Sequence, residues 1–281
     1  MTFLIVFICC AAELTYMSSQ AFRATQWIVS WHRWLTDKIQ WPGWRGGGAL
    51  VVALVLPCFV LGALFNIVVA ESTLMSLVGG SAVLLFCFGS RDIAGDIESY
   101  TSHSLDADAQ LPPPDKENFL QDVGSNDGDP DGPTMRAVVI EANDSLFAPA
   151  LWFCILGPVG ALLFRMSSTL QRSFDDATAE AVLARRLYNV LLWLPARLLG
   201  IGLGLAGTLG PVMGVLRDRA YDLSESNTLL GDAALAALGP QAVDDGDDSH
   251  VASIRSMFRL VKHGFIVWLV VLGLLSSAGL A

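Results

Sequence analysis

The stretch ALVVALVLPCFVLGALFNIVVA, residues Ala49–Ala70, contains 22 residues without a charge and is closed by Glu71. A helix needs about 20 apolar residues to cross the hydrocarbon core of a bilayer. This stretch therefore predicts a membrane-spanning helix. Thr73–Phe88 follows after the short link Glu71-Ser72 and is also uncharged, so the two runs together predict a helical hairpin in the membrane.

Three further apolar runs extend this pattern along the chain. Phe147–Phe164 and Gly264–Ala281 each predict one more span. Leu187–Leu216 is interrupted by Pro195 and Pro211, which predicts either one broken span or a helix lying at the membrane surface. The fold class expected is all-α: an integral membrane protein with four or five transmembrane helices, an interfacial helix and an acidic cytoplasmic loop.

The composition agrees with a lipid environment. Of the 281 residues 53% are hydrophobic and 16% are charged, and the mean hydropathy is +0.52. Ordinary soluble domains have roughly 25% charged residues, so a disordered chain is excluded and a water-soluble one is disfavoured. The net charge of −10 and a pI near 4.7 argue against nucleic-acid binding, which requires a basic surface.

The negative charge is concentrated in one segment. Residues 89–146 carry 13 acidic and 3 basic residues, a net charge of −10, and the rest of the chain sums to zero. Prolines at 112–114 and the stretch 125–133 predict a loop. Asp127–Gly132 resembles the start of a calcium-binding loop, but position 12 is Val138 instead of glutamate, which favours a solvated acidic loop. Residues 244–248 predict a second acidic loop.

Tryptophan is concentrated near the N-terminus, where residues 18–48 hold five of the eight in the chain. Trp27, Trp31 and Trp34 are spaced to share one helix face, and basic residues lie among them. Aromatic residues mixed with cations are typical of a helix at the headgroup level of a membrane. We therefore expect an interfacial helix in this region.

The distribution of lysine and arginine predicts the orientation, because basic loops stay in the cytoplasm. Residues 18–48, 89–146 and 217–263 are expected there, and basic residues between 166 and 186 are the exception. The expected organisation is an N-terminal membrane region (1–88), an acidic cytoplasmic loop (89–146), a membrane core with broken helices (147–216), a cytoplasmic loop (217–263) and a C-terminal transmembrane helix (264–281).

Motifs for cofactors or metals give little support for such sites. Gly202-Leu-Gly204-Leu-Ala-Gly207 matches the dinucleotide pattern, but it lies in an apolar run where small residues let membrane helices approach closely. The five cysteines and four histidines lack metal-ligand spacing. The sequence therefore identifies no catalytic residue, cofactor site or metal site, and it leaves the cofactors and the oligomeric state open.

Ionisable and polar residues beside the membrane segments form the candidate site. Such groups are costly in lipid and usually face a cavity or a partner, although salt bridges between helix ends would explain them equally well. Glu141 and Asp144 would share a face of a regular helix, and Arg165 could join them only if the chain bends at Pro149 or Gly157-Pro158. The set comprises Glu13, Arg91, Asp92, Glu141, Asn143, Asp144, Arg165 and Arg197.

Several strings together resemble a known family. They are Phe88-Gly-Ser-Arg-Asp-Ile93, Glu141-Ala-Asn-Asp-Ser-Leu-Phe147, Leu156-Gly-Pro-Val-Gly-Ala-Leu-Leu-Phe-Arg165 and Leu192-Trp-Leu-Pro-Ala-Arg-Leu198. In this order they resemble the AmpE family of inner-membrane signalling modulators associated with β-lactamase induction. The resemblance implies a regulatory protein of cell-wall recycling in the bacterial inner membrane, with a signalling protein or a muropeptide as partner.

The part from residue 141 to residue 198 is also similar to the wider CobD/CbiB family, membrane proteins that join an amino-alcohol to a corrinoid carboxylate. This chain departs from that family at residues 13–16, which read Glu-Leu-Thr-Tyr, and at Ile140-Glu141. The similarity implies, as an alternative function, a membrane enzyme that forms an amide bond on a carboxylate. A transporter of a muropeptide or a similar solute is the third class considered.

Overall fold

The computed structural model describes Ile5, Val6 and Cys9 and the ranges 26–38, 48–71, 73–88, 132–174, 178–220, 222–223, 225–239 and 247–277. All regular elements within these ranges are helices, which confirms the expected all-α class. Glu13, Arg91, Asp92 and most of the acidic segment 89–146 lie outside the described residues.

Helix length and composition identify a multi-pass membrane protein. By length and composition alone, three described helical segments could cross a bilayer if Thr134–Ser173, which bends at Gly157, is counted as one: Thr134–Ser173, Ala179–Ala206 and Ser253–Leu274. Two shorter apolar helical segments, Leu50–Phe65 and Leu77–Cys87, belong to the hairpin that the sequence predicts.

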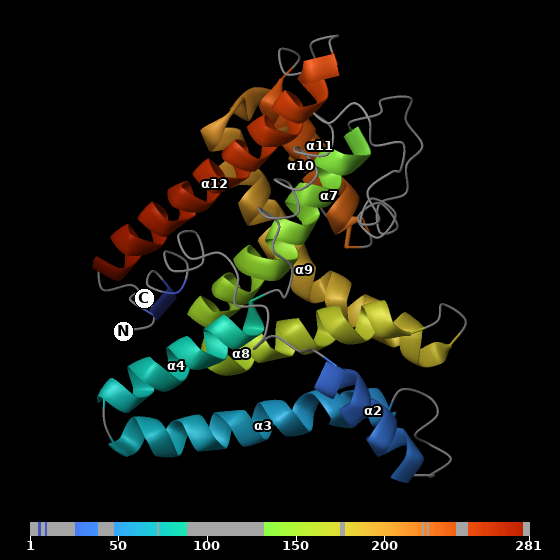
Figure 1. Ribbon diagram of the computed structural model, residues 1–281, viewed down its shortest axis with the longest axis vertical. Coiled ribbons are helices and arrows are strands. Elements are labelled where there is room, and N and C mark those ends of the chain that lie inside the picture. The colour runs from blue at the N-terminus through green and yellow to red at the C-terminus, as the bar shows by residue number, and fades with distance from the viewer. Residues whose placement is uncertain are drawn as a thin grey trace. The chain divides into compact units, whose positions relative to one another are not determined.

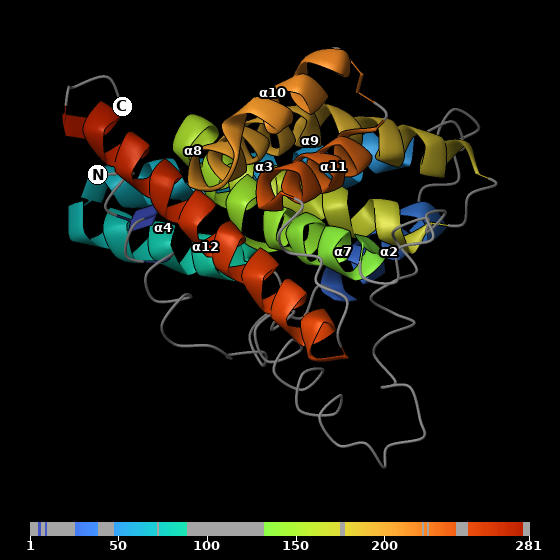
Figure 2. The same ribbon diagram turned by 90° about the horizontal axis from the view of Figure 1, so that it is seen from above.

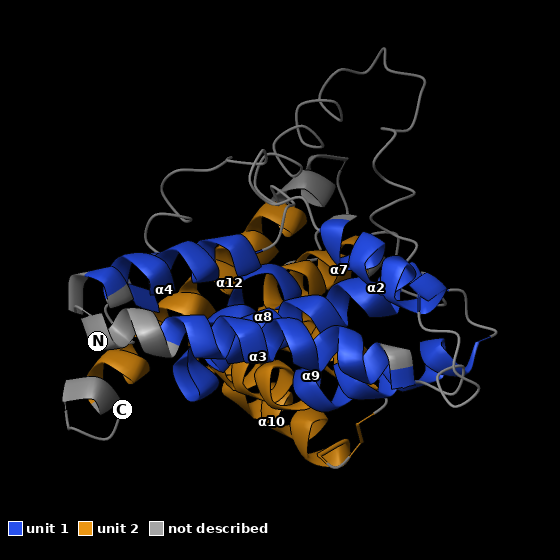
Figure 3. Ribbon diagram, turned by 90° about the horizontal axis from the view of Figure 1, so that it is seen from below, with its two compact units in different colours: residues 1–91, 144–192, 275–281 blue, residues 92–143, 193–274 orange. Residues whose placement is uncertain are grey.

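The chain divides into two compact units, which Figure 3 shows in blue and orange. The first unit comprises Met1–Arg91, Asp144–Leu192 and Leu275–Ala281. The second comprises Asp92–Asn143 and Trp193–Leu274.

In the first unit, three helices pack around α8 (Ala148–Ser173). Helices α3 (Gly48–Glu71) and α4 (Thr73–Cys87) lie side by side as a hairpin and both contact α8 (Figure 1). Helix α2 (Gln26–Lys38) packs against α3 and α8.

Helix α2 carries the tryptophans expected at the membrane interface. The indole nitrogen of Trp31 donates a hydrogen bond of 3.3 Å to the carbonyl oxygen of Ala53, which ties α2 to α3. The Trp31 ring stacks on Trp34, and the Trp34 side chain is 51% exposed. An exposed indole beside exposed Arg33 and Lys38 supports the interfacial helix, which stays a prediction.

Helix α8 is broken into two arms at Gly157. This residue has φ +68° and ψ −157°, a conformation that glycine adopts without the steric cost of a Cβ atom. The chain reverses there. The evidence is that a Cβ atom added at Gly160 would lie only 2.5 Å from the carbonyl oxygen of Trp152, eight residues earlier. The bend that the sequence places at Gly157-Pro158 is therefore present, and residues 148–156 and 158–173 form a helical hairpin.

Among the described residues, the second unit contains α7 (Gly132–Ala142), α10 (Leu209–Asp218), α11 (Ser226–Leu238) and α12 (Asp247–Ser277) up to Leu274. Helix α11 packs against α7 and against α10 (Figure 2). Regular structure extends into two segments that the sequence predicts as loops. Helix α7 starts inside the segment 89–146, and the segment 217–263 contains α11 and the first half of α12.

Helix α9 (Ala179–Ala206) corrects the expected break at Pro195, because the helix continues through this proline and ends only before Gly207 and Thr208. Proline is tolerated in membrane helices where neighbouring groups satisfy the freed backbone. Gly202 lies against the Trp268 ring: a Cβ atom added at Gly202 would lie 2.7 Å from atoms of this ring. The glycine-rich motif is thus helical up to Ala206 and serves close helix packing, not a nucleotide-binding turn.

Candidate functional site

A π-helix, Asn143–Phe147, joins α7 to α8 and forms the start of the candidate site. Pro149 explains its position, since proline has no N–H to donate to the carbonyl of Ser145 and its ring crowds that carbonyl. The helix widens locally instead of kinking. Single π-turns inside α-helices are rare and are frequent at functional sites.

Asp144 lies in this π-helix, and its side chain is only 2% exposed. The hydroxyl of Tyr188 donates a hydrogen bond of 2.6 Å to Oδ2 of Asp144. Nη2 of Arg172 donates to the same oxygen at 3.0 Å and forms an ion pair with the carboxylate. The two charge-assisted hydrogen bonds compensate for the loss of hydration of a buried charge.

The reversal of α8 brings Arg172 to Asp144. From Asp144 to Leu156 the first arm rises about 18 Å, and from Pro158 to Arg172 the second arm rises about 21 Å. Arms of similar length that meet at Gly157 return the chain to its starting level.

Tyr188 reaches the carboxylate from α9, which is fixed to α8 by a second contact. The indole nitrogen of Trp152 donates a hydrogen bond of 3.0 Å to the carbonyl oxygen of Leu191, about one turn beyond Tyr188. The Tyr188 ring also packs on Phe164 with ring centroids 6.1 Å apart. Asp144, Arg172 and Tyr188 therefore form one cluster held by both arms of α8 and by α9, which we call the Asp144 cluster.

The other residues of the expected set have different surroundings. Asn143 is fully buried at the start of the π-helix, and Glu141 is half-buried in α7. The shared face expected for Glu141 and Asp144 assumes regular α-helical spacing, which the π-helix interrupts. Arg165 is buried in α8, two turns before Arg172 and on the same helix face.

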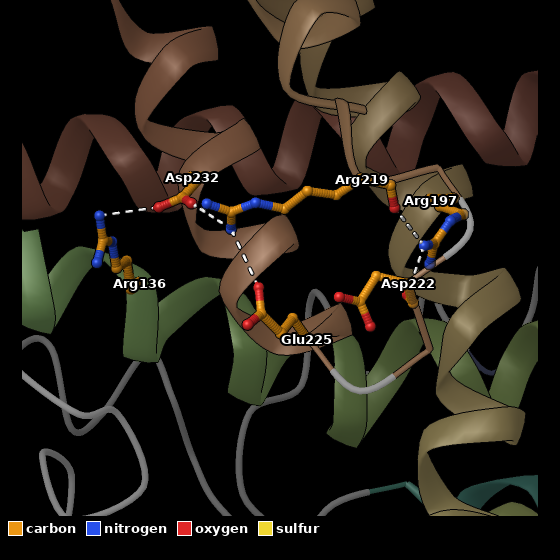
Figure 4. A network of polar contacts seen from close by, with 6 residues as sticks. All are labelled: Arg136, Arg197, Arg219, Asp222, Glu225 and Asp232. Atoms are coloured by element: carbon orange, nitrogen blue, oxygen red, sulfur yellow. Dashed lines mark hydrogen bonds and ion pairs between the residues drawn. The ribbon is translucent and has the colours of Figure 1, made fainter. Parts of the chain in front are cut away.

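Arg197 belongs to a separate network in the second unit (Figure 4). Its guanidinium donates hydrogen bonds of 2.8–3.0 Å to the carbonyl oxygens of Arg219, Ala220 and Asp222, the turn that follows α10. It also lies over the Trp193 ring, 4.5 Å from the centroid. Arg197 therefore holds a turn of the backbone through three hydrogen bonds.

The same network continues through charged side chains (Figure 4). Asp232 of α11 accepts contacts from Arg136 of α7 at 2.8 Å and from Arg219 at 3.0 Å, and Arg219 also lies 3.7 Å from Glu225. These ion pairs join α7, the end of α10 and α11. Within the described ranges, no three His, Cys, Asp or Glu side chains are grouped to hold a metal ion.

Sequence reasoning missed two members of the Asp144 cluster, Arg172 and Tyr188. A signal for Arg172 existed, since it follows Arg165 by seven residues and so shares its helix face once the bend at Gly157 is accepted. Tyr188 lies 44 residues from Asp144 in an apolar stretch, and nothing local distinguishes it.

These features define a multi-pass helical membrane protein with a buried, ion-paired carboxylate in a π-helix. The chain belongs to the CobD/Cbib protein family, whose model matches residues 6–240. It is 28% identical over 166 residues to the "Cobalamin biosynthesis protein CobD" of Chromobacterium violaceum, a match that covers 56% of this chain and 52% of the relative. The chain thus aligns with about half the length of this relative. No solved structure matches it significantly.

Proposed function

We propose that the protein is a membrane enzyme that forms an amide bond between an amine and a carboxylate carried by a corrinoid. Family membership over residues 6–240 and the CobD relative support this substrate class. The observation in the molecule that carries the proposal is the Asp144 cluster, in which a buried carboxylate orients an arginine that reaches the surface.

Arg172 is the residue proposed to receive the substrate carboxylate. Its side chain is 35% exposed, whereas that of its partner Asp144 is almost fully buried. A guanidinium is planar and matches the geometry of a carboxylate, and orientation by a fixed partner lowers the entropy cost of binding. Tyr188 in turn holds Asp144. Asp144 and Tyr188 are positioning residues in this proposal.

The reaction requires a co-substrate. Condensation of a carboxylate with an amine releases water, and the acyl oxygen must first be converted into a leaving group. A nucleoside triphosphate supplies such an activation, and the amine then attacks the activated carbonyl. Binding and orientation of the carboxylate are the steps we assign to this chain's residues.

The test uses the full-length protein in lipid nanodiscs, with a corrinoid that bears one free carboxylate, an amino-alcohol and ATP. We expect a product heavier than the corrinoid by the amino-alcohol minus one water, measured by mass spectrometry. Arg172→Gln should reduce its formation at least tenfold, mainly through KM, and Arg186→Gln, an exposed arginine on α9, should not. Absence of product with the wild-type protein would contradict the proposal.

A second candidate function is regulation of cell-wall recycling and β-lactamase induction from the bacterial inner membrane, as in the AmpE family. The observation that favours it is that Asp144 is enclosed by Arg172 and Tyr188, as in a purely structural cluster. The departures at residues 13–16 and Ile140-Glu141 from the amide-forming family point the same way.

Gene deletion separates the two functions. If β-lactamase induction is lost on deletion and restored by both the wild-type protein and Arg172→Gln, the regulatory function is supported and no amide chemistry is needed for it. If induction is unaffected by deletion, the regulatory function is contradicted. Mass analysis of small molecules that copurify with the protein would distinguish a muropeptide from a corrinoid.

A further inference from the structure

Asn143 has an unusual environment for an amide side chain. It is 0% exposed, and neither its Nδ2 nor its Oδ1 atom has a hydrogen-bond partner in the described part of the chain. Buried amides in proteins are normally paired, because removing them from water without a partner costs free energy. An apolar side chain of the same size would avoid this cost, so the stability of the fold does not explain the asparagine.

The position of Asn143 adds a second reason to assign it a function. It is the first residue of the π-helix that contains Asp144, and such turns are frequent at functional sites. Asp144 has partners for its carboxylate, whereas the amide beside it in the chain has none. Within the described residues, both polar atoms of Asn143 lack a hydrogen-bond partner, whereas Oδ2 of Asp144 has two.

The chemistry of an amide restricts what it can bind. Its nitrogen donates hydrogen bonds and its oxygen accepts them, so a complementary group must do both. A carboxylate only accepts and an ammonium only donates. A hydroxyl does both through a single atom, whereas another carboxamide has a separate donor and acceptor, spaced to pair with both atoms of the asparagine. We propose that Asn143 binds a carboxamide group of the ligand through a pair of N–H···O hydrogen bonds. This inference rests on the proposed function, because it assigns that ligand to corrinoids whose side chains end in carboxamides.

The first experiment asks whether Asn143 is unpaired. Asn143→Leu keeps the size of the side chain and removes both polar atoms, so the melting temperature in detergent should rise by about 2–4 °C. Asn227→Leu is the matched control, since Asn227 in α11 also has a buried Oδ1 atom without a partner. A fall in melting temperature with Asn143→Leu would show that the amide has partners within the protein or in ordered water, and would overturn the inference.

The second experiment measures binding by absorbance titration with two probes. These are cobinamide, a corrinoid whose side chains end in carboxamides, and cobyrinic acid, the related corrinoid whose side chains end in carboxylates. Asn143→Leu should weaken cobinamide binding at least tenfold and leave cobyrinic acid binding unchanged, and Asn227→Leu should change neither. Because Asn143 is covered, its ligand must displace neighbouring groups, and slow association is expected.

A second variant distinguishes a specific loss of binding from misfolding. Asn143→Ala introduces no new bulk and should show the same selective loss of cobinamide binding. Equal binding of cobinamide by the wild-type protein and both variants, or an equal loss for both probes, would overturn the inference. Wild-type protein that binds neither corrinoid would contradict the proposed function and the corrinoid as ligand, and the melting temperatures would still decide whether Asn143 is paired.

Discussion

The carboxylate of Asp144 lies 3.0 Å from the guanidinium of Arg172, which follows it by 28 residues. In one straight helix these residues would be about 42 Å apart. The contact exists because the chain reverses at Gly157, and it closes the open end of the hairpin that α8 forms. One ion pair thus joins the two ends of a membrane segment.

The Asp144–Arg172 pair should show energetic coupling. We expect a double-mutant cycle of Asp144→Asn and Arg172→Gln to give about 1–2 kcal/mol in the free energy of unfolding. This coupling energy is smaller than that of a fully buried ion pair, because Arg172 is partly exposed and solvent screens its charge. The measurement is denaturant unfolding in mixed micelles. Strictly additive losses, the result expected for Asp144→Asn with the control Arg186→Gln, would contradict the coupling.

The reversal at Gly157 should depend on glycine. Gly157→Ala should cost about 1–2 kcal/mol, because an alanine at φ +68° brings its Cβ atom against the backbone. Apart from this adjacent backbone, no atom lies within 4 Å of the added Cβ, so the loss comes from the backbone conformation and not from a clash with other side chains. Gly79→Ala in α4, also without neighbours, should be neutral or stabilising. Equal effects of the two substitutions on unfolding would refute the assignment.

Stability should fall in mild acid because of His32. His32 lies on α2 with its ring against Phe174, and its burial there lowers its pKa from 6.5, whereas nearby Glu180 opposes this shift in part. The unfolded chain therefore binds a proton at a higher pH than the folded one. The free energy of unfolding should be constant above about pH 7 and decrease as the pH falls below 6.5, until the folded pKa is reached.

The measurement for His32 is the melting temperature between pH 5 and pH 8. His32→Gln should flatten the decrease below pH 6.5, and the exposed control His263→Gln should leave it in place. An unchanged pH profile in His32→Gln would show that other groups cause the loss.

The orientation predicted from basic residues is also testable. The segment 89–146 should be cytoplasmic, so Ser125→Cys in a variant without the native cysteines should react with an impermeant thiol reagent only after the cells are opened. Labelling in intact cells would show that the α3–α4 hairpin has the opposite orientation.

The length of apolar runs was sufficient to predict the helical membrane fold, because a spanning helix must bury nearly every side chain in lipid or protein. The break in α8 was also predictable, since Gly157-Pro158 combines a residue that permits positive φ with one that cannot donate a hydrogen bond. Both features depend on local sequence alone.

The composition of the Asp144 cluster could not be predicted in the same way. Arg172 and Tyr188 reach Asp144 through the angle between the arms of α8 and the packing of α9, which no local pattern encodes. The shared face expected for Glu141 and Asp144 assumes regular α-helical spacing, and the residue spacing per turn changes in the π-helix. The continuation of α9 through Pro195 depends likewise on its surroundings.

The hairpin of α8 restricts the evolution of chain length. Each residue inserted in a helix advances it by about 1.5 Å and rotates it by about 100°, so an insertion or deletion in either arm would turn Arg172 away from Asp144. Neighbouring side chains can repack around a substitution between these two residues. They cannot compensate for an inserted or deleted residue, unless a second insertion or deletion restores the spacing. Natural relatives that keep this ion pair should therefore hold the separation of 28 residues constant.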